Sequence, residues 1–172
     1  MKELSWILTA FALLTLVSPL LGHFDSQFFA PDIALLTALY AGSRAELLPA
    51  LITAFVVGLL KDGLALSAPV GLYTEINVFA VLLARVLARR VDLHSAVPVM
   101  ATSAGMSIGA TGMFLILESI FHRQFESYGE VVRMALPLAL MTMVLAPVHF
   151  ALFDKIAGRF DQGARGTILL KR

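Results

Sequence analysis

The stretch Gly-Met-Ser-Ile-Gly at residues 105–109 is the first candidate for chemistry, because it fits the G-x-S-x-G pattern of a serine nucleophile. His149 is the residue available as its base. A nucleophile elbow needs a turn between a strand and a helix, whereas this stretch lies inside a long apolar run. Small residues recur around it at three- and four-residue spacing: Ala101, Gly105, Gly109 and Gly112. We therefore interpret Gly105 and Gly109 as a helix-packing or partner-binding face; an intramembrane enzyme using Ser107 stays a less favoured alternative.

Asp62 and Gly63 suggest a second chemistry, since lipid head-group transferases hold a metal between paired aspartates. Here the following apolar run offers only Glu75, and one carboxylate per helix makes a weak Mg²⁺ site because the oxygen ligands must converge. The four histidines are scattered without an i, i+4 pair, and no glycine-rich phosphate loop is present. The chain has no cysteine, which excludes thiolate metal sites and cysteine nucleophiles. We predict neither a metal, nor a cofactor, nor an enzyme.

A set of polar residues then remains near the ends of two neighbouring apolar runs: Lys61, Asp62, Glu75 and Asn77. Ionisable residues at membrane depth are costly and often functional. Pro69-x-Gly71 turns the chain, so the end of one run can face the start of the next. We predict that Lys61 pairs with Glu75 and that the charges fix this corner between two helices. The alternative is that Lys61 extends its ammonium toward water while Asp62 pairs locally.

The composition of the chain predicts which type of secondary structure positions these residues. The 172 residues are 59% hydrophobic and 15% charged, with a mean hydropathy of +0.86, whereas a soluble domain is nearer one half apolar and one quarter charged. Backbone groups in lipid must be satisfied internally, and no strand-like alternation is visible. We predict an all-α integral membrane protein with a single transmembrane domain over residues 1–172. The net charge of +1 gives no reason to expect a nucleic-acid partner.

Six apolar segments are predicted as transmembrane helices, at roughly 4–22, 31–43, 46–66, 72–88, 96–120 and 132–153. The first is long enough to cross a bilayer and lacks a small-residue cleavage signature, so we expect a retained span. The second is short for a crossing; it either starts earlier, through Phe28 and Phe29, or is tilted and partly re-entrant. Pro31 suits its first turn, and Asp32 favours the positive end of its dipole.

Orientation follows from the placement of Lys and Arg. With six crossings and the N-terminus inside, ten of the thirteen basic residues lie at cytoplasmic ends, and only Lys61, Arg123 and Arg133 lie outside. This distribution predicts that both termini are cytoplasmic. Residues 154–172 then form a short basic cytoplasmic tail.

Several short motifs together resemble the MreD family of rod shape-determining membrane proteins. They are the run FAPDIALLTALYAG at 29–42, with its Pro31-Asp32 opening, followed in order by Gly58, Asp62, Pro69 and Gly71, and then a helix that ends in basic residues. The resemblance covers chain length, the number of spans and the short second span. Beyond about residue 96 it is mainly one of hydropathy.

The resemblance implies a non-enzymatic scaffold of the bacterial cell-elongation machinery, located in the inner (cytoplasmic) membrane as a multi-pass protein. Such a scaffold binds MreC, and together they couple the MreB cytoskeleton to the peptidoglycan synthase RodA and its transpeptidase partner. It also implies a fold similar to that of the substrate-binding subunits of energy-coupling-factor vitamin transporters. A vitamin-binding subunit is therefore the main alternative, and it would need a polar pocket, for which Glu75, Asn77 and Arg123 are the available lining residues.

Overall fold

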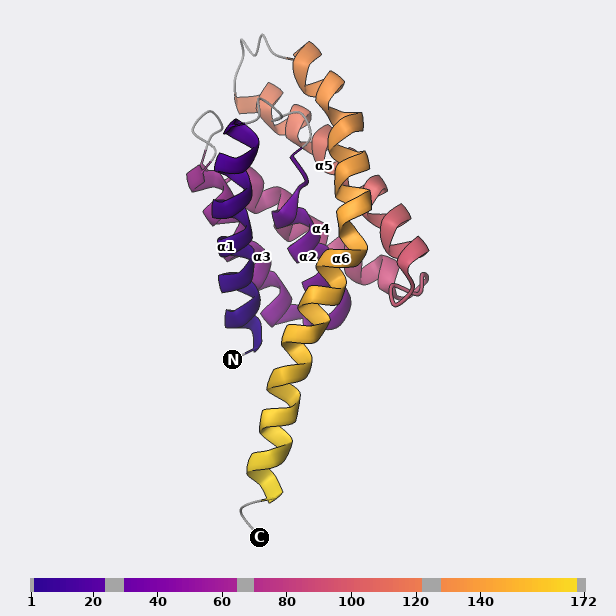
Figure 1. The fold of residues 1–172 in the computed structure, drawn as a ribbon. Helices are drawn as coiled ribbons and strands as arrows, with labels where there is room; N and C mark the ends of the chain where they lie inside the picture. Colours follow the sequence, from indigo (N-terminus) through magenta and orange to yellow (C-terminus); the bar gives the residue numbers. More distant parts are fainter. Residues whose placement is uncertain (1, 24–29, 65–69, 122–127, 170–172) are drawn as a thin grey trace.

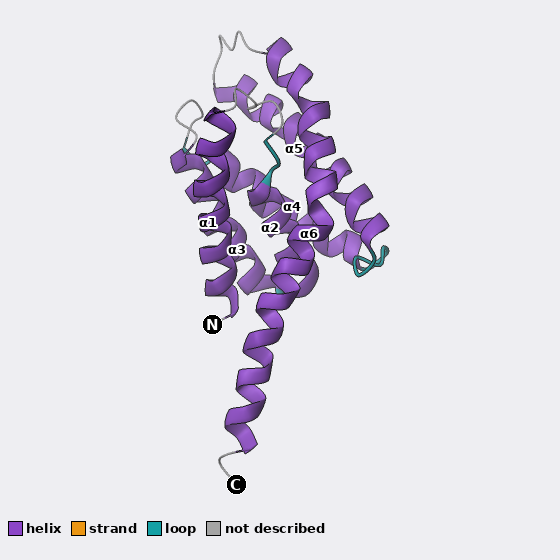
Figure 2. Ribbon diagram, in the orientation of Figure 1, coloured by secondary structure: helices purple, strands orange, loops and turns teal. Residues whose placement is uncertain are grey.

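The computed structural model describes the chain except residues 1, 24–29, 65–69, 122–127 and 170–172, and its described part contains six helices and no strand (Figures 1 and 2). The helices are α1 Lys2–His23, α2 Ile33–Arg44, α3 Leu47–Leu64, α4 Leu72–Ala88, α5 Ala96–Phe121 and α6 Tyr128–Leu169. The all-α prediction is confirmed. Five of the six apolar segments match their helices within two residues at each end, because a long apolar run bounded by polar or turn-forming residues marks the limits of a helix.

The sixth segment is the exception. Helix α6 runs for 42 residues, from Tyr128 to Leu169, and so includes most of the segment that the sequence marks as a tail. Figure 1 shows it extending well beyond the other helices toward the C-terminus. It contains Pro137 and Pro147, which a helix tolerates at membrane depth when neighbouring groups satisfy the freed carbonyls.

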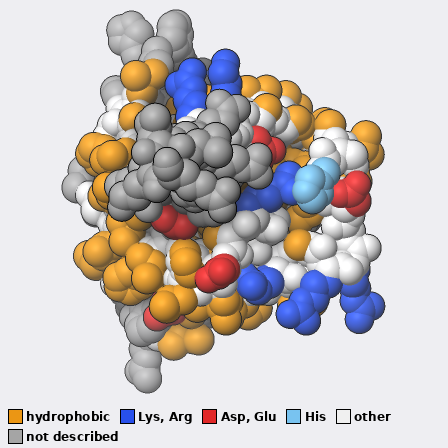
Figure 3. All heavy atoms as spheres, turned by 90° about the horizontal axis from the view of Figure 1, so that it is seen from below, with side chains coloured by type: hydrophobic (Ala, Val, Ile, Leu, Met, Phe, Trp, Pro, Cys, Tyr) orange, Lys and Arg blue, Asp and Glu red, His pale blue; other side chains and the backbone are white. Residues whose placement is uncertain are grey.

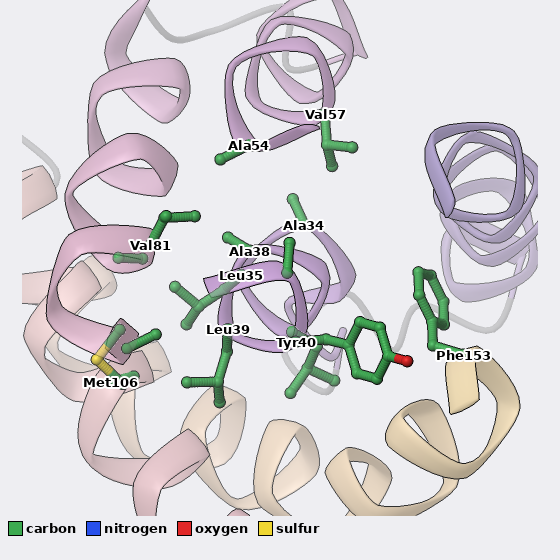
Figure 4. Packing of buried hydrophobic residues seen from close by; sticks show 14 of the residues in the cluster. Ala34, Leu35, Ala38, Leu39, Tyr40, Ala54, Val57, Val81, Met106 and Phe153 are labelled. Carbon is green, nitrogen blue, oxygen red and sulfur yellow. The ribbon is translucent and has the colours of Figure 1, made fainter. Parts of the chain in front are cut away.

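Helix α2 is the centre of the molecule, not a helix exposed to lipid. Its 12 residues make it about 18 Å long, and every residue from Ile33 to Gly42 is buried. Figure 4 shows its side chains pointing outward in several directions, with Leu35 on the side of Val81 and Met106, and Tyr40 toward Phe153. A short helix is possible here because protein, not lipid, surrounds it. An earlier start through Phe28 and Phe29 lies outside the described residues.

The start of α2 differs slightly from the prediction. The helix begins at Ile33, and Asp32 is its N-cap, accepting a hydrogen bond from the Leu35 N–H at 3.0 Å. Pro31 precedes the cap instead of occupying the first turn. A carboxylate at this position satisfies one of the helix's unpaired N–H groups and faces the positive end of its dipole.

The outer surface of the bundle is rich in large apolar side chains, many of them more than half exposed, including Leu8, Leu48, Ile116, Leu136 and Val148. Apolar surface on this scale indicates contact with lipid or with other membrane proteins. Among the described residues, three helical stretches are long and apolar enough to cross a membrane: 47–64, 96–120 and 128–159.

Polar contacts fix the relative directions of the helices. The start of α2 meets the end of α3, where Asp32 binds Lys61. The end of α2 meets the end of α4, where Arg85 donates to the Ala45 carbonyl, and the loop before α5, where Arg44 donates to the Leu93 carbonyl. We call this second side the basic end, because most of the described basic residues lie there: Lys2, Arg44, Arg85, Arg89, Arg90, Lys155 and Arg159. Figure 3 views the molecule from this side.

Candidate functional site

The corner between α3 and α4 is built around the buried carboxylate of Asp62. Gly71, the N-cap of α4, has a φ of +106° and provides no side-chain cap. Asp62 supplies that cap from the neighbouring helix: it accepts from the N–H of Tyr73 at 2.8 Å and from the N–H and hydroxyl of Thr74 at 3.1 and 2.6 Å. Only 3% of the residue is exposed. Hydrogen bonds and the helix dipole together stabilise a carboxylate at such a position.

Gly58 allows this capping arrangement. It lies one turn before Asp62 on α3, and a Cβ placed there would come within 2.5 Å of the Thr74 Cα and 3.0 Å of the Tyr73 carbonyl oxygen. The two helices therefore touch backbone to backbone at this point. The order Gly58-x3-Asp62 places the close approach and the capping carboxylate on the same face of α3.

Lys61 joins a third helix to the corner. Its ammonium lies 2.8 Å from Asp32 Oδ2, so Asp32 caps α2 with one oxygen and binds Lys61 with the other. The same ammonium lies 4.1 Å from the centroid of the Tyr73 ring, within the range of a cation–π interaction. Tyr73 in turn stacks on Phe114 of α5. The corner cluster, which we define as Asp32, Gly58, Lys61, Asp62, Tyr73 and Thr74, ties α2, α3 and α4 together.

The predicted Lys61–Glu75 pair is wrong. Glu75 is exposed on the first turn of α4, while Lys61 is bound to Asp32. Asp62 does not depend on Lys61 either, since its partners are the N–H groups and hydroxyl at the start of α4. The two charges are therefore adjacent in sequence but serve two different helices. Pro69, the other residue predicted for this turn, lies outside the described residues.

A second line of polar contacts joins α2 to α6 and was not predicted. The Thr142 hydroxyl accepts from the Asp32 N–H at 3.0 Å, and Thr37 Oγ1 lies 3.3 Å from His149 Nε2. Farther along, Tyr40 donates to Asp154 at 2.9 Å. These pairs lie more than 100 positions apart in the sequence. Neither composition nor local spacing indicates such partners, although lone polar residues inside an apolar run were a signal that they exist.

The serine motif is part of a regular helix. Residues 105–109 lie in the middle of α5, and Ser107 is buried. His149 contacts Thr37 and stacks on Phe153, and the buried Ser107 hydroxyl has no hydrogen-bond partner among the described residues, so the two side chains are not joined as nucleophile and base. A Cβ added at Gly105 or at Gly109 would meet no neighbouring atom within 4 Å. The small-residue face is therefore open, and no helix of the described chain packs against it there.

An apolar groove lies beside these glycines, between α4 and α5. It holds about 90 Å³ and is lined by residues of both helices, including Ile76, Phe79, Leu83, Gly105, Gly109 and Met113. Leu35 of α2 contributes to its wall. No charged side chain of the described residues lines the groove, so its surface suits hydrocarbon.

Two of the three residues proposed for a vitamin pocket lie in different environments. Glu75 is exposed, whereas Asn77 is 1% exposed, with its amide donating to the Tyr73 carbonyl at 2.7 Å and its own oxygen without a hydrogen bond. Arg123 lies outside the described residues. Within the described part of the chain, no group of three or more histidine, aspartate or glutamate residues is placed to hold a metal ion. Comparison of the chain with family models, curated proteins and solved structures gives no match.

Proposed function

We propose that this chain is a non-enzymatic membrane scaffold of the MreD type, which binds MreC and helps couple MreB to peptidoglycan synthesis by RodA and its transpeptidase partner. In this role it maintains rod shape from the bacterial inner membrane. It crosses the membrane six times with both termini in the cytoplasm.

The observation that carries the proposal is the convergence of the motif residues. Pro31-Asp32, Gly58, Asp62 and Gly71 carry the resemblance to MreD and are spread over 40 positions of the sequence. In the structure Asp32 caps α2, Asp62 caps α4, and Gly58 lets α3 touch α4. The motif residues therefore build one corner that joins three helices. Residues that build part of a fold together are better support for a resemblance to MreD than residues that only occur in the same order.

The arrangement of charge supports the proposed orientation. Seven of the described basic residues lie at the basic end, whereas Lys61 and Arg133 lie toward the other. In membranes an excess of Lys and Arg marks the cytoplasmic side. In Figure 1 the N-terminal end of α1 and the C-terminal end of α6 both lie toward this side. The buried α2 contributes the short second crossing, protected from lipid by its neighbours.

The test is co-purification and complementation. The full chain, expressed in a bacterium that has lost its rod shape through loss of its own MreD, is expected to retain MreC through detergent purification and to restore rods. Reporters fused to either terminus are expected to signal the cytoplasm. Rounded cells with no bound MreC at normal abundance would overturn the scaffold role. A thermal stabilisation by a vitamin would then favour the transporter subunit.

A further inference from the structure

On α4, the chain runs from the groove between α4 and α5 toward the basic end. The α4 wall of the groove contains Ile76, Phe79 and Leu83, at a spacing that keeps them on one stripe of the helix. Helix α4 ends at Ala88, but Arg89 keeps a right-handed helical conformation and the N–H groups of Arg90 and Val91 both bond to the Leu87 carbonyl, at 2.9 and 2.8 Å, so a turn of near-helical geometry carries the chain to Arg90.

Arg90 lies seven residues beyond Leu83 and so continues this stripe, whereas Arg89 is turned about 120° around the helix from Leu83. Arg90 is exposed and forms no ion pair within the described part of the chain. Arg85 is directed elsewhere, toward the Ala45 carbonyl.

We propose that the groove binds an anionic phospholipid, with one acyl chain between α4 and α5 and the phosphate at Arg90. The proposal requires that the chain lies in a bilayer, but it does not rest on the scaffold role. A lipid is the occupant that fits, because an apolar slot is followed, two turns farther along α4, by an exposed cation that forms no ion pair within the described residues. Basic residues between helices at the membrane surface recognise lipid phosphates in this way.

The dimensions agree with a lipid in one leaflet. Arg90 lies 11 residues from Phe79, or about 16 Å along a helix. Half of a hydrocarbon core is about 15 Å. A phosphate at Arg90 therefore places its acyl chain beside Leu83 and Phe79, opposite Gly105 and Gly109, which leave space above the α5 backbone.

The shape of the slot favours a hydrocarbon chain over a helix. A helix with its side chains is about 10–12 Å across, whereas a slot of 90 Å³ holds a few methylene groups. Met106 and Met113 line it with unbranched, flexible side chains that adapt to an irregular occupant.

The acidic residue of the nearby loop does not oppose an anion. Hydrogen bonds from His94, through its backbone N–H at 3.1 Å and its ring at 2.9 Å, lower the pKa of the Asp92 carboxyl. Asp92 is therefore ionised at neutral pH, but its charge is directed to His94, which also contacts Arg44. Figure 3 shows several Lys and Arg side chains gathered near one edge of this face of the molecule.

The experiment uses the full chain, purified and delipidated in a neutral detergent. Phosphatidylglycerol and phosphatidylcholine with identical acyl chains are titrated while the thermal midpoint is measured, and bound lipid is counted by native mass spectrometry. We expect phosphatidylglycerol to raise the midpoint by several degrees more than phosphatidylcholine. Equal effects of the two lipids would overturn the proposal.

Matched variants locate the site. Arg90→Gln is expected to weaken phosphatidylglycerol binding about five-fold, the effect of one basic residue near a membrane surface, and Arg89→Gln is expected to leave it unchanged. Gly109→Leu fills the slot and removes stabilisation by both lipids. Gly112→Leu adds the same side chain outside the lining residues, where a Cβ meets nothing within 4 Å, and is expected to retain binding. Equal losses within either pair would contradict the assignment.

A photoreactive phosphatidylglycerol tests the site without any mutation, and so without any effect on folding. In native membranes its acyl-chain adducts are expected on α4 and α5 near Phe79 and Met113. Adducts spread evenly over all lipid-facing helices would overturn the proposal. So would a groove occupied by another protein, seen as a protein crosslink from a single cysteine introduced by Met113→Cys into this cysteine-free chain.

Discussion

Gly58 and Gly109 have similar sequence surroundings but opposite structural roles. Both lie in the middle of long apolar helices and both have small or apolar neighbours. At Gly58, α3 touches the backbone of α4, and a Cβ would come within 2.5 Å of Thr74. At Gly109 a Cβ would meet nothing within 4 Å, and the space beside it belongs to the groove. A small residue in a membrane helix therefore indicates either a contact already made or a surface still open.

Chemistry around the two glycines explains the difference. One turn after Gly58 comes Asp62, whose carboxylate needs the N–H groups of α4 and holds the two helices together. The described α5 residues that line the groove are glycine, alanine and methionine. None of them offers a side-chain hydrogen bond to α4, so a gap remains between the two helices. Gly42 follows the Gly58 pattern, since a Cβ at that position would come within 2.8 Å of the Val81 carbonyl oxygen.

Replacing each glycine by alanine tests this difference most directly. Gly58→Ala is expected to destabilise the fold by about 3 kcal/mol, at the upper part of the usual cost of overpacking, because the obstacle is backbone and cannot rotate away. Gly109→Ala is expected to be neutral or to stabilise by up to about 1 kcal/mol, since alanine favours a helix. The measurement is the unfolding free energy of both variants in the same detergent. Equal effects would mean that the two sites are packed alike.

The limits of sequence reasoning follow from the same residues. Apolar runs locate the limits of five helices within two residues, because each run is long, strongly apolar and bounded by polar or turn-forming residues. Asp32 and Asp62 are recognisable as special because carboxylates at membrane depth are costly. Their partners are not recognisable: Lys61 binds Asp32, 29 positions away, only because the buried α2 starts beside the end of α3. The burial of α2 itself, and the open face at Gly109, depend on how the whole bundle packs.

A smaller effect is expected at Asp62. Asp62→Ala leaves the N–H groups of Tyr73 and Thr74 without their acceptor, and losing a helix cap of this kind costs about 2 kcal/mol. Asp62→Asn is expected to cost about half as much, because its carbonyl can still accept one hydrogen bond. Asp92→Ala, at an exposed carboxylate, provides the control and is expected to change little. The readout is the thermal midpoint, and the proposed binding of MreC is checked by co-purification at matched expression level. An unchanged midpoint for Asp62→Ala would show that water replaces the cap.

The smallest expected effects distinguish the observed ion pair from the one that the sequence predicts. Lys61→Met leaves Asp32 with its Leu35 N–H and the α2 dipole, and the Lys61 and Asp32 side chains are 21% and 9% exposed, so partial hydration keeps the cost to about 1 kcal/mol. Glu75→Gln, on an exposed side chain, is expected to stay within about 0.5 kcal/mol of zero. A double-mutant cycle between Lys61→Met and Asp32→Asn should show coupling, whereas Lys61→Met with Glu75→Gln should be additive. If Lys61 coupled energetically to Glu75 and not to Asp32, its ammonium would bind α4 instead of the start of α2. Asp62 would then cap α4 without any link to α2, and the corner would join two helices instead of three.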